Sequence, residues 1–169
     1  MILPLNGWAA GKLQKSFTAD GEFFKAFENE DIIEASVNVS CTASKRGQDI
    51  LLDIGMEGKV TVICDRCLEN LDIPVSLTAA LVSRTEEGGE ESADGREVLL
   101  HEVTDKELDL SQVVYDYICL SLPMQRVHPE GECNPDTVRY LGRTIEVPDP
   151  VEDDSQNPFS VLKGLFNGK

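Results

Sequence analysis

The sequence predicts an α+β fold, in which one principal packed helix lies against a mainly antiparallel, twisted β-sheet and a short helix ends the chain. Between residues 33 and 79, apolar and polar residues alternate with a period of two, which is the pattern of half-buried strands. Short turns separate these runs, and such turns join antiparallel neighbours. Only one long run, at 110–121, has the period of a strong amphipathic helix. These observations argue against a doubly wound parallel sheet.

The first predicted element is a short amphipathic helix at 20–27. Asp20 is a typical N-cap residue, and Phe23, Phe24 and Phe27 follow on one helical face. An aromatic face of this kind can serve as a binding stripe, but the spacing favours packing into the core.

The predicted strands come next. One begins at Ile33 and turns at Gly47, and Ile50–Met56 pairs back on it. Gly58 leads into the segment before Cys64–Cys67, and the alternation resumes after it, so this tetrapeptide is expected to cap a β-hairpin. The apolar members of these runs are Ala35, Val37, Val39, Cys41, Val60, Val62, Leu71, Ile73, Val75, Leu77 and Ala79.

The strongest helical pattern opens at Asp109–Ser111 and ends before Pro123. Its broad face is expected to pack on the sheet, which would bring the residues after the helix near the hairpin tip. This face consists of Leu110, Val113, Val114, Tyr117, Ile118 and Ser121.

Composition divides the chain into a single α+β domain at 1–142, an acidic linker at 143–156 and a helical tail at 157–169. The linker combines carboxylates with Pro148 and Pro150, and the tail opens with Asn157 and Pro158 at the N-cap and first helical positions. The tail helix could dock on its own domain or on a partner. A second acidic segment, at 86–95, is predicted to be a flexible loop.

The charge of the chain bears on its partners. Thirty-one acidic and fifteen basic residues in 169 give a formal net charge of −16. Such a surface repels phosphate backbones, so extensive direct binding of nucleic acid is not expected. It suits a basic protein partner, although the same charge can serve solubility alone.

No stretch approaches the length of a membrane span, and the apolar start is broken at Pro4 and Gly7 without a preceding basic region. We therefore expect a cytoplasmic protein without a membrane partner, in which cysteines are reduced or bound to metal.

Two distant motifs together have the composition of a metal site. Cys64 and Cys67 form a Cys-x-x-Cys pair, and His128 and Cys133 flank a segment that contains the turn formers Pro129 and Gly131. Three cysteines and one histidine are a common set of ligands for structural zinc. The sequence therefore predicts that Cys64, Cys67, His128 and Cys133 bind one zinc ion.

Other interpretations of these cysteines stay open. A single Cys-x-x-Cys can be a redox pair, two unrelated thiols or half of a degraded metal site. A redox pair is less favoured because a strand, and not a helix, is predicted after Cys67. Cys41 and Cys119 lie in apolar patterns and are expected to be buried core thiols. His101 falls inside a predicted strand at 98–103, so no pairing of a nucleophile with a base is evident and no catalytic residue is assigned.

Several blocks of the sequence resemble the YceD family, also called DUF177. Val60–Glu69 contains the Cys-x-Arg-Cys-Leu segment of that family, and Leu120–Pro123, His128, Cys133 and the terminal 157–165 are similar to its later blocks. Many members carry further cysteines after the helix, whereas this chain has His128 and Cys133 there. The family is associated with accumulation of large-subunit ribosomal RNA, so the resemblance implies a role in ribosome assembly.

We therefore expect a non-enzymatic interaction factor in ribosome assembly. It would support accumulation of large-subunit ribosomal RNA through a basic ribosomal or assembly protein, with zinc in a structural role. The alternatives are a direct RNA-binding protein, for which Lys45, Arg46, Arg139 and Arg143 are sparse, and a metal-dependent or thiol redox enzyme.

Overall fold

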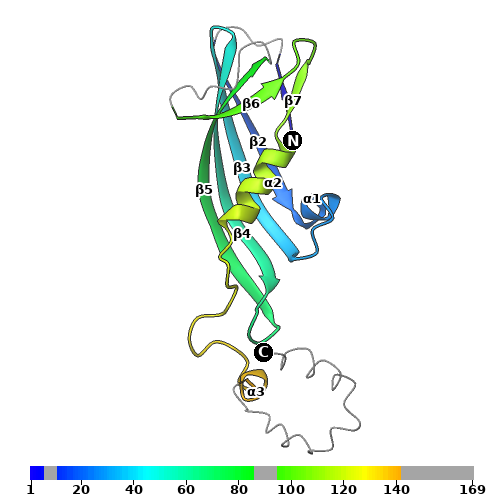
Figure 1. The fold of residues 1–169 in the computed structure, drawn as a ribbon, viewed down its shortest axis with the longest axis vertical. Helices are drawn as coiled ribbons and strands as arrows, with labels where there is room; N and C mark the ends of the chain where they lie inside the picture. The colour runs from blue at the N-terminus through cyan, green and yellow to red at the C-terminus, as the bar shows by residue number, and fades with distance from the viewer. Residues whose placement is uncertain (6–10, 86–94, 142–169) are drawn as a thin grey trace, which may run out of the picture. The chain divides into compact units, whose positions relative to one another are not determined.

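A five-stranded sheet forms the main body of the protein (Figure 1). The computed structural model describes residues 1–5, 11–85 and 95–141. In the unit Met1–Asn134 the sheet has the order β2-β3-β4-β5-β6, and a second sheet pairs β1 with β7. The strands are β1 Ile2–Pro4, β2 Lys12–Asp20, β3 Ile32–Arg46, β4 Asp49–Ile63, β5 Asn70–Thr85, β6 Glu97–His101 and β7 Glu107–Asp109. The helices of this unit are α1 Gly21–Ala26 and α2 Ser111–Ser121, and the separate unit that begins at Pro135 contributes α3 Pro135–Val138.

The predicted α+β class is confirmed, since all pairings of the large sheet are antiparallel except that between β5 and β6. β3 and β4 meet at the predicted turn, where Gly47 has a φ of 67°. Gly58 lies within the long strand β4, where a Cβ atom would come within 2.0 Å of the carbonyl oxygen of Ser36. Only a residue without a side chain therefore fits where the backbones of the paired strands β3 and β4 come this close.

The core lies on the face of the sheet that α2 crosses (Figure 1). Residues of β3, β4 and β5 mostly alternate between this buried face and an exposed polar face, as expected for an antiparallel sheet with one solvated side. Leu110, Val114 and Ile118 of the predicted helical face are buried. Phe24 of α1 packs into the core, as predicted. Phe23 and Phe27 are half-buried beside it, and Phe27 stacks on Tyr115 of α2 with ring centroids 4.4 Å apart.

Two features of the sheet differ from the alternation-based prediction. β2 was not predicted, because its edge position leaves Lys12, Gln14 and Lys15 exposed and only Ala19 fully buried. β6 was predicted as a strand, but its parallel pairing with β5 does not follow from alternation.

Cys119 corrects another expectation. It is half-buried at the flank of α2, and not a core thiol as predicted, because it lies about 100° around the helix from the buried Ile118. Cys41 is buried in β3 as predicted. The acidic segment at 86–94, the linker and the helical tail lie outside the described residues.

Candidate metal centre

The tip of the β4–β5 hairpin forms the first half of the candidate site. The strands end where Ile63 pairs with Asn70. The N–H of Cys64 donates to the carbonyl of Glu69 at 2.8 Å, and the N–H of Leu68 donates to the carbonyl of Cys64 at 3.0 Å. These bonds fold the intervening residues into a tight turn, and Leu68 takes a φ of 62°. Cys64 and Cys67 are both buried within it.

The segment that follows α2 forms the second half. It is fastened to the tip by a reciprocal pair of hydrogen bonds: the N–H of Asp65 donates to the carbonyl of Arg126 at 2.7 Å, and the N–H of Arg126 donates to the Asp65 carboxylate at 2.7 Å. At the far end of the segment, the side chain of Asn134 donates to that of Glu69 at 2.6 Å. These contacts place His128 and Cys133 against the hairpin.

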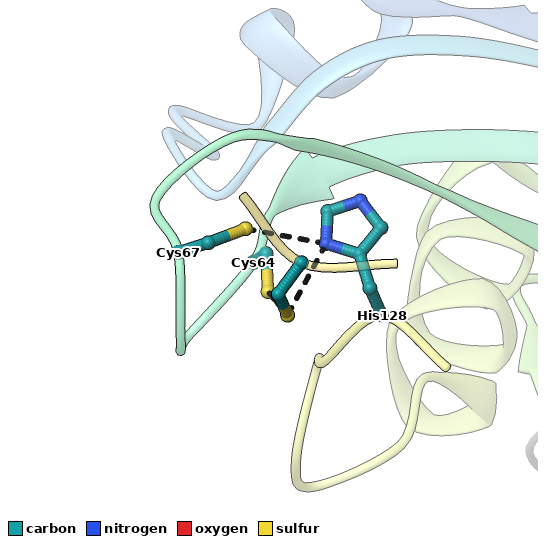
Figure 2. Close-up of side chains that lie close together, drawn as sticks. Cys64, Cys67 and His128 are labelled. Atoms are coloured by element: carbon teal, nitrogen blue, oxygen red, sulfur yellow. Dashed lines mark hydrogen bonds between the residues drawn. The ribbon is translucent and has the colours of Figure 1, made fainter. Parts of the chain in front are cut away.

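The two halves bring together all four residues singled out from the sequence, and Figure 2 shows the side chains of Cys64, Cys67 and His128 converging. The four ligand atoms lie within 4.8 Å of one another. The Sγ atoms of Cys64 and Cys133 are 4.0 Å apart, and His128 Nδ1 lies 3.3 Å from Cys67 Sγ and 3.9 Å from Cys133 Sγ.

These distances match a tetrahedral zinc site. Zn–S bonds of about 2.3 Å and a Zn–N bond of about 2.0 Å imply S···S edges of roughly 3.8 Å and S···N edges of roughly 3.5 Å. The three edges given above differ from these values by a few tenths of an ångström, and no pair of the four atoms is more than 4.8 Å apart, so one ion could contact all four atoms after side-chain movements of about 1 Å or less. The chemistry of the donor set fits as well, since thiolate and imidazole are the ligands that zinc prefers.

The ring of His128 is oriented for this role. Its Nε2 lies 3.1 Å from the carbonyl oxygen of Asn70, which can only accept a hydrogen bond. The proton therefore belongs on Nε2, and Nδ1, which faces the cysteines, carries the free lone pair. A backbone carbonyl that fixes the other ring nitrogen is a typical second-shell contact of a metal-bound histidine.

Hydrogen bonds around the cluster favour the thiolate form of Cys64. Burial opposes ionisation of Cys64, but hydrogen bonds from the backbone N–H groups of Cys67, Arg66 and His128 outweigh it and lower the pKa of the thiol from 9.0 to about 6. Arg66 Nη1 lies 3.9 Å from Cys133 Sγ and brings a positive charge to the edge of the cluster. Hydrogen bonding with Cys64 raises the pKa of His128, whereas burial and the neighbouring thiols raise that of Cys133. A cation bound here would displace the remaining thiol protons.

A site of this composition is closed, because four protein donors leave no position for substrate. Elsewhere, His101 Nδ1 lies 2.8 Å from the hydroxyl of Ser83. Ser83 is fully buried, so we interpret its hydrogen bond with His101 as a structural contact. The contacts of Asp65, Asn70 and Arg126 were not predicted, because each involves a main-chain N–H or carbonyl group that any residue type carries; only Asp65 also contributes its side chain.

A family model described as large ribosomal RNA subunit accumulation protein YceD matches residues 52–166, and the chain belongs to this family. The resemblance noted in the sequence is thereby confirmed. Curated proteins and solved structures give no significant match. In the part of the chain that the structure describes, no helix is long and apolar enough to cross a membrane.

Proposed function

We propose that this protein is a non-enzymatic, cytoplasmic factor in assembly of the large ribosomal subunit, and that it supports accumulation of large-subunit ribosomal RNA. The family match over residues 52–166 carries this proposal. It includes β5, α2 and all four residues of the metal cluster. YceD is not a known enzyme family, which agrees with a closed cluster and with the absence of an assigned catalytic residue.

Depletion of the protein in the organism that encodes it is the direct test. The ratio of large-subunit to small-subunit ribosomal RNA should fall, and free large subunits should become scarce in a sucrose gradient. Expression of the intact chain should restore both. An unchanged ratio under full depletion would contradict the proposal.

We propose further that the immediate partner is a basic ribosomal or assembly protein, and not naked RNA. The net charge of −16 supports this, because complementary potentials speed the encounter of oppositely charged proteins and disfavour phosphate backbones. The complex should weaken as salt rises, because the Debye length falls to about 8 Å near physiological ionic strength. Pull-downs at graded salt, beside titration with bare ribosomal RNA, test this. Tight and salt-tolerant binding of RNA alone would favour the direct RNA-binding alternative.

The cluster of Cys64, Cys67, His128 and Cys133 is proposed to hold a structural zinc ion. The donor set, the near-tetrahedral distances and the Asn70 contact to His128 support this role. When bound, the ion would join the hairpin tip to the segment after α2. Metal analysis of the natively purified protein should give one zinc per chain. Cobalt substitution should produce the visible absorption of a tetrahedral thiolate site, and an octahedral spectrum would contradict the ligand set.

A further inference from the structure

Two large apolar side chains, those of Leu120 and Met124, are exposed at the end of α2, and we call them the apolar ridge. Leu120 is 84% exposed and Met124 is 99% exposed. Leu120 belongs to the last turn of α2, and Met124 follows Pro123, which terminates the helix. Both side chains contact water in the isolated chain, and covering them with a partner would be favourable through the hydrophobic effect.

Hollows flank the ridge, and Cys119 and Leu120 contribute to both. The first has a volume of about 540 Å³, and the second has a volume of about 410 Å³. The first is lined by Glu97, Val113, Asp116, Tyr117, Cys119 and Leu120. Each is large enough to receive a leucine, methionine or phenylalanine side chain.

The rim of the first hollow is acidic, whereas the carboxylate at the second hollow is paired with an arginine. Glu97 and Asp116 line the first hollow, and Asp31 lines the second. Among the described lining residues, Arg126 is the only positively charged one, and it already lies 3.3 Å from the Asp31 carboxylate. Glu97 accepts a hydrogen bond from the Tyr117 hydroxyl at 2.7 Å, which holds its carboxylate beside the first hollow. An occupant must therefore combine apolar side chains with positive charge.

We propose that the ridge and its two hollows bind a segment of the basic protein partner, in which one or two large apolar side chains are flanked by Lys or Arg. This inference rests on the proposed function and assigns the partner a place on the surface. Apolar side chains would enter the hollows beside Leu120 and Met124, and cationic side chains would pair with Glu97 and Asp116 at the first hollow. RNA does not fit this site, because its phosphates would face these two carboxylates.

The probe is a synthetic amphipathic peptide of about four helical turns that carries leucines on one face and lysines on the other. Two matched peptides replace its lysines with glutamates or its leucines with serines. Binding to the full chain is measured by fluorescence anisotropy, and its location by amide chemical shifts. The Leu–Lys peptide should bind, with shifts concentrated at 113–124. Each matched peptide should bind about tenfold more weakly or less.

Variants of the protein locate the contact. Leu120→Ser and Met124→Ser should each weaken the Leu–Lys peptide about tenfold. Both side chains are exposed, so the fold is expected to persist, and circular dichroism checks this. Val103→Ser removes another apolar side chain, 72% exposed, and should leave binding unchanged. Glu97→Gln should weaken binding, whereas Glu57→Gln, on the exposed face of β4, should not.

The outcomes separate this inference from the proposed function. Failure of the Leu–Lys peptide to bind, equal binding of the Leu–Glu peptide, or indifference to Leu120 and Met124 would each overturn the ridge as the docking site. Binding that appears only after residues 157–169 are deleted would assign the ridge to the chain's own tail and also overturn it. None of these outcomes bears on the ribosomal RNA ratio under depletion, so the proposed assembly role would stand even if this docking site were disproved.

Discussion

The long strands and the hairpin tip of this protein are held together by different physical means. β3, β4 and β5 bury a continuous set of apolar side chains against α2, and their ladders extend over about fourteen paired positions. The junction between the tip and residues 122–134 contains no helix or strand. It depends on the bonds between Asp65 and Arg126, on the Asn70 contact to His128 and on the four-residue cluster.

We therefore expect the sheet to fold without metal, and the junction to depend on its directional contacts. Burial is spread over many residues, so the loss of one contact in the sheet is absorbed by its neighbours. The junction has few contacts, so the loss of one is expected to disorder it. Perturbing one region and measuring the stability of both tests this difference.

The largest effect is expected for Gly58→Ala, within the sheet. The added Cβ would lie 2.0 Å from Ser36 O and 2.7 Å from the Cα atom of Val37, both backbone atoms that cannot move without breaking the ladder. We expect a loss of unfolding free energy of about 3–5 kcal/mol, measured by urea denaturation. Gly55→Ala in the same strand is the control, since its Cβ meets only the Ser40 hydroxyl, which can rotate away. Equal stability of the two variants would contradict the close approach of the β3 and β4 backbones at Gly58.

The next effect concerns the junction. Cys64→Ser should abolish stoichiometric zinc, because a hydroxyl is a poor ligand in a thiolate site. The segment 123–134 should become open to limited proteolysis, and the unfolding free energy should fall by about 1–3 kcal/mol. A chelator should reproduce the proteolysis in the unmodified chain.

Cys119→Ser is the matched control, because it removes a half-buried cysteine outside the cluster. It should keep the zinc and the protease resistance. Collapse of the whole sheet in Cys64→Ser, seen as loss of the β-type circular dichroism, would contradict the division between the two regions.

The two regions also differ in how far the sequence could predict them. Alternation predicted β3, β4 and β5 because one face of each is buried, and the same pattern placed Cys64 and Cys67 at a tip. The helical period predicted α2, and the position of its end explains why His128 and Cys133 come near that tip. β2 was missed because an edge strand with exposed lysines lacks a clean apolar face.

Other features of the structure leave no local signal. The parallel placement of β6 depends on the path of the chain between two strands, and alternation is the same in parallel and antiparallel strands. Of the two bonds between Asp65 and Arg126, one joins main-chain groups and the other joins the Arg126 N–H to the Asp65 carboxylate, across 61 residues of sequence. Neither alternation nor helical period predicts such a pairing. The acidic hollow beside α2 is lined in part by Glu97 of β6, so the helix sequence alone could not predict it.

A smaller effect of opposite sign is expected at the tip. Leu68 has a φ of 62° and is 70% exposed, so it adopts a left-handed conformation with little burial to offset the strain. Leu68→Gly should therefore stabilise the protein by about 0.5–1 kcal/mol, or raise Tm by about 1–4 °C. Glu28→Gly provides a second site with positive φ, 56°, outside the hairpin tip. A lowered Tm in Leu68→Gly with unchanged zinc would show that Leu68 packs in the folded protein.

The smallest effect is a pH dependence where the sheet approaches the tip. Asp72 of β5 accepts hydrogen bonds from Lys59 at 2.5 Å and Thr61 at 2.6 Å, and these contacts, that of Lys59 foremost, lower its pKa. A carboxyl group whose pKa is lower in the folded state stabilises the protein above its unfolded pKa of about 3.9, and this contribution is lost as pH falls through the folded value. The difference in unfolding free energy between the parent chain and Asp72→Asn should therefore shrink between about pH 5 and pH 2. Because the metal cluster is the same in both proteins, its own pH dependence cancels from this difference. Glu57→Gln on β4 should show a smaller change over that interval, and a difference for Asp72→Asn that grows on acidification would refute the assignment.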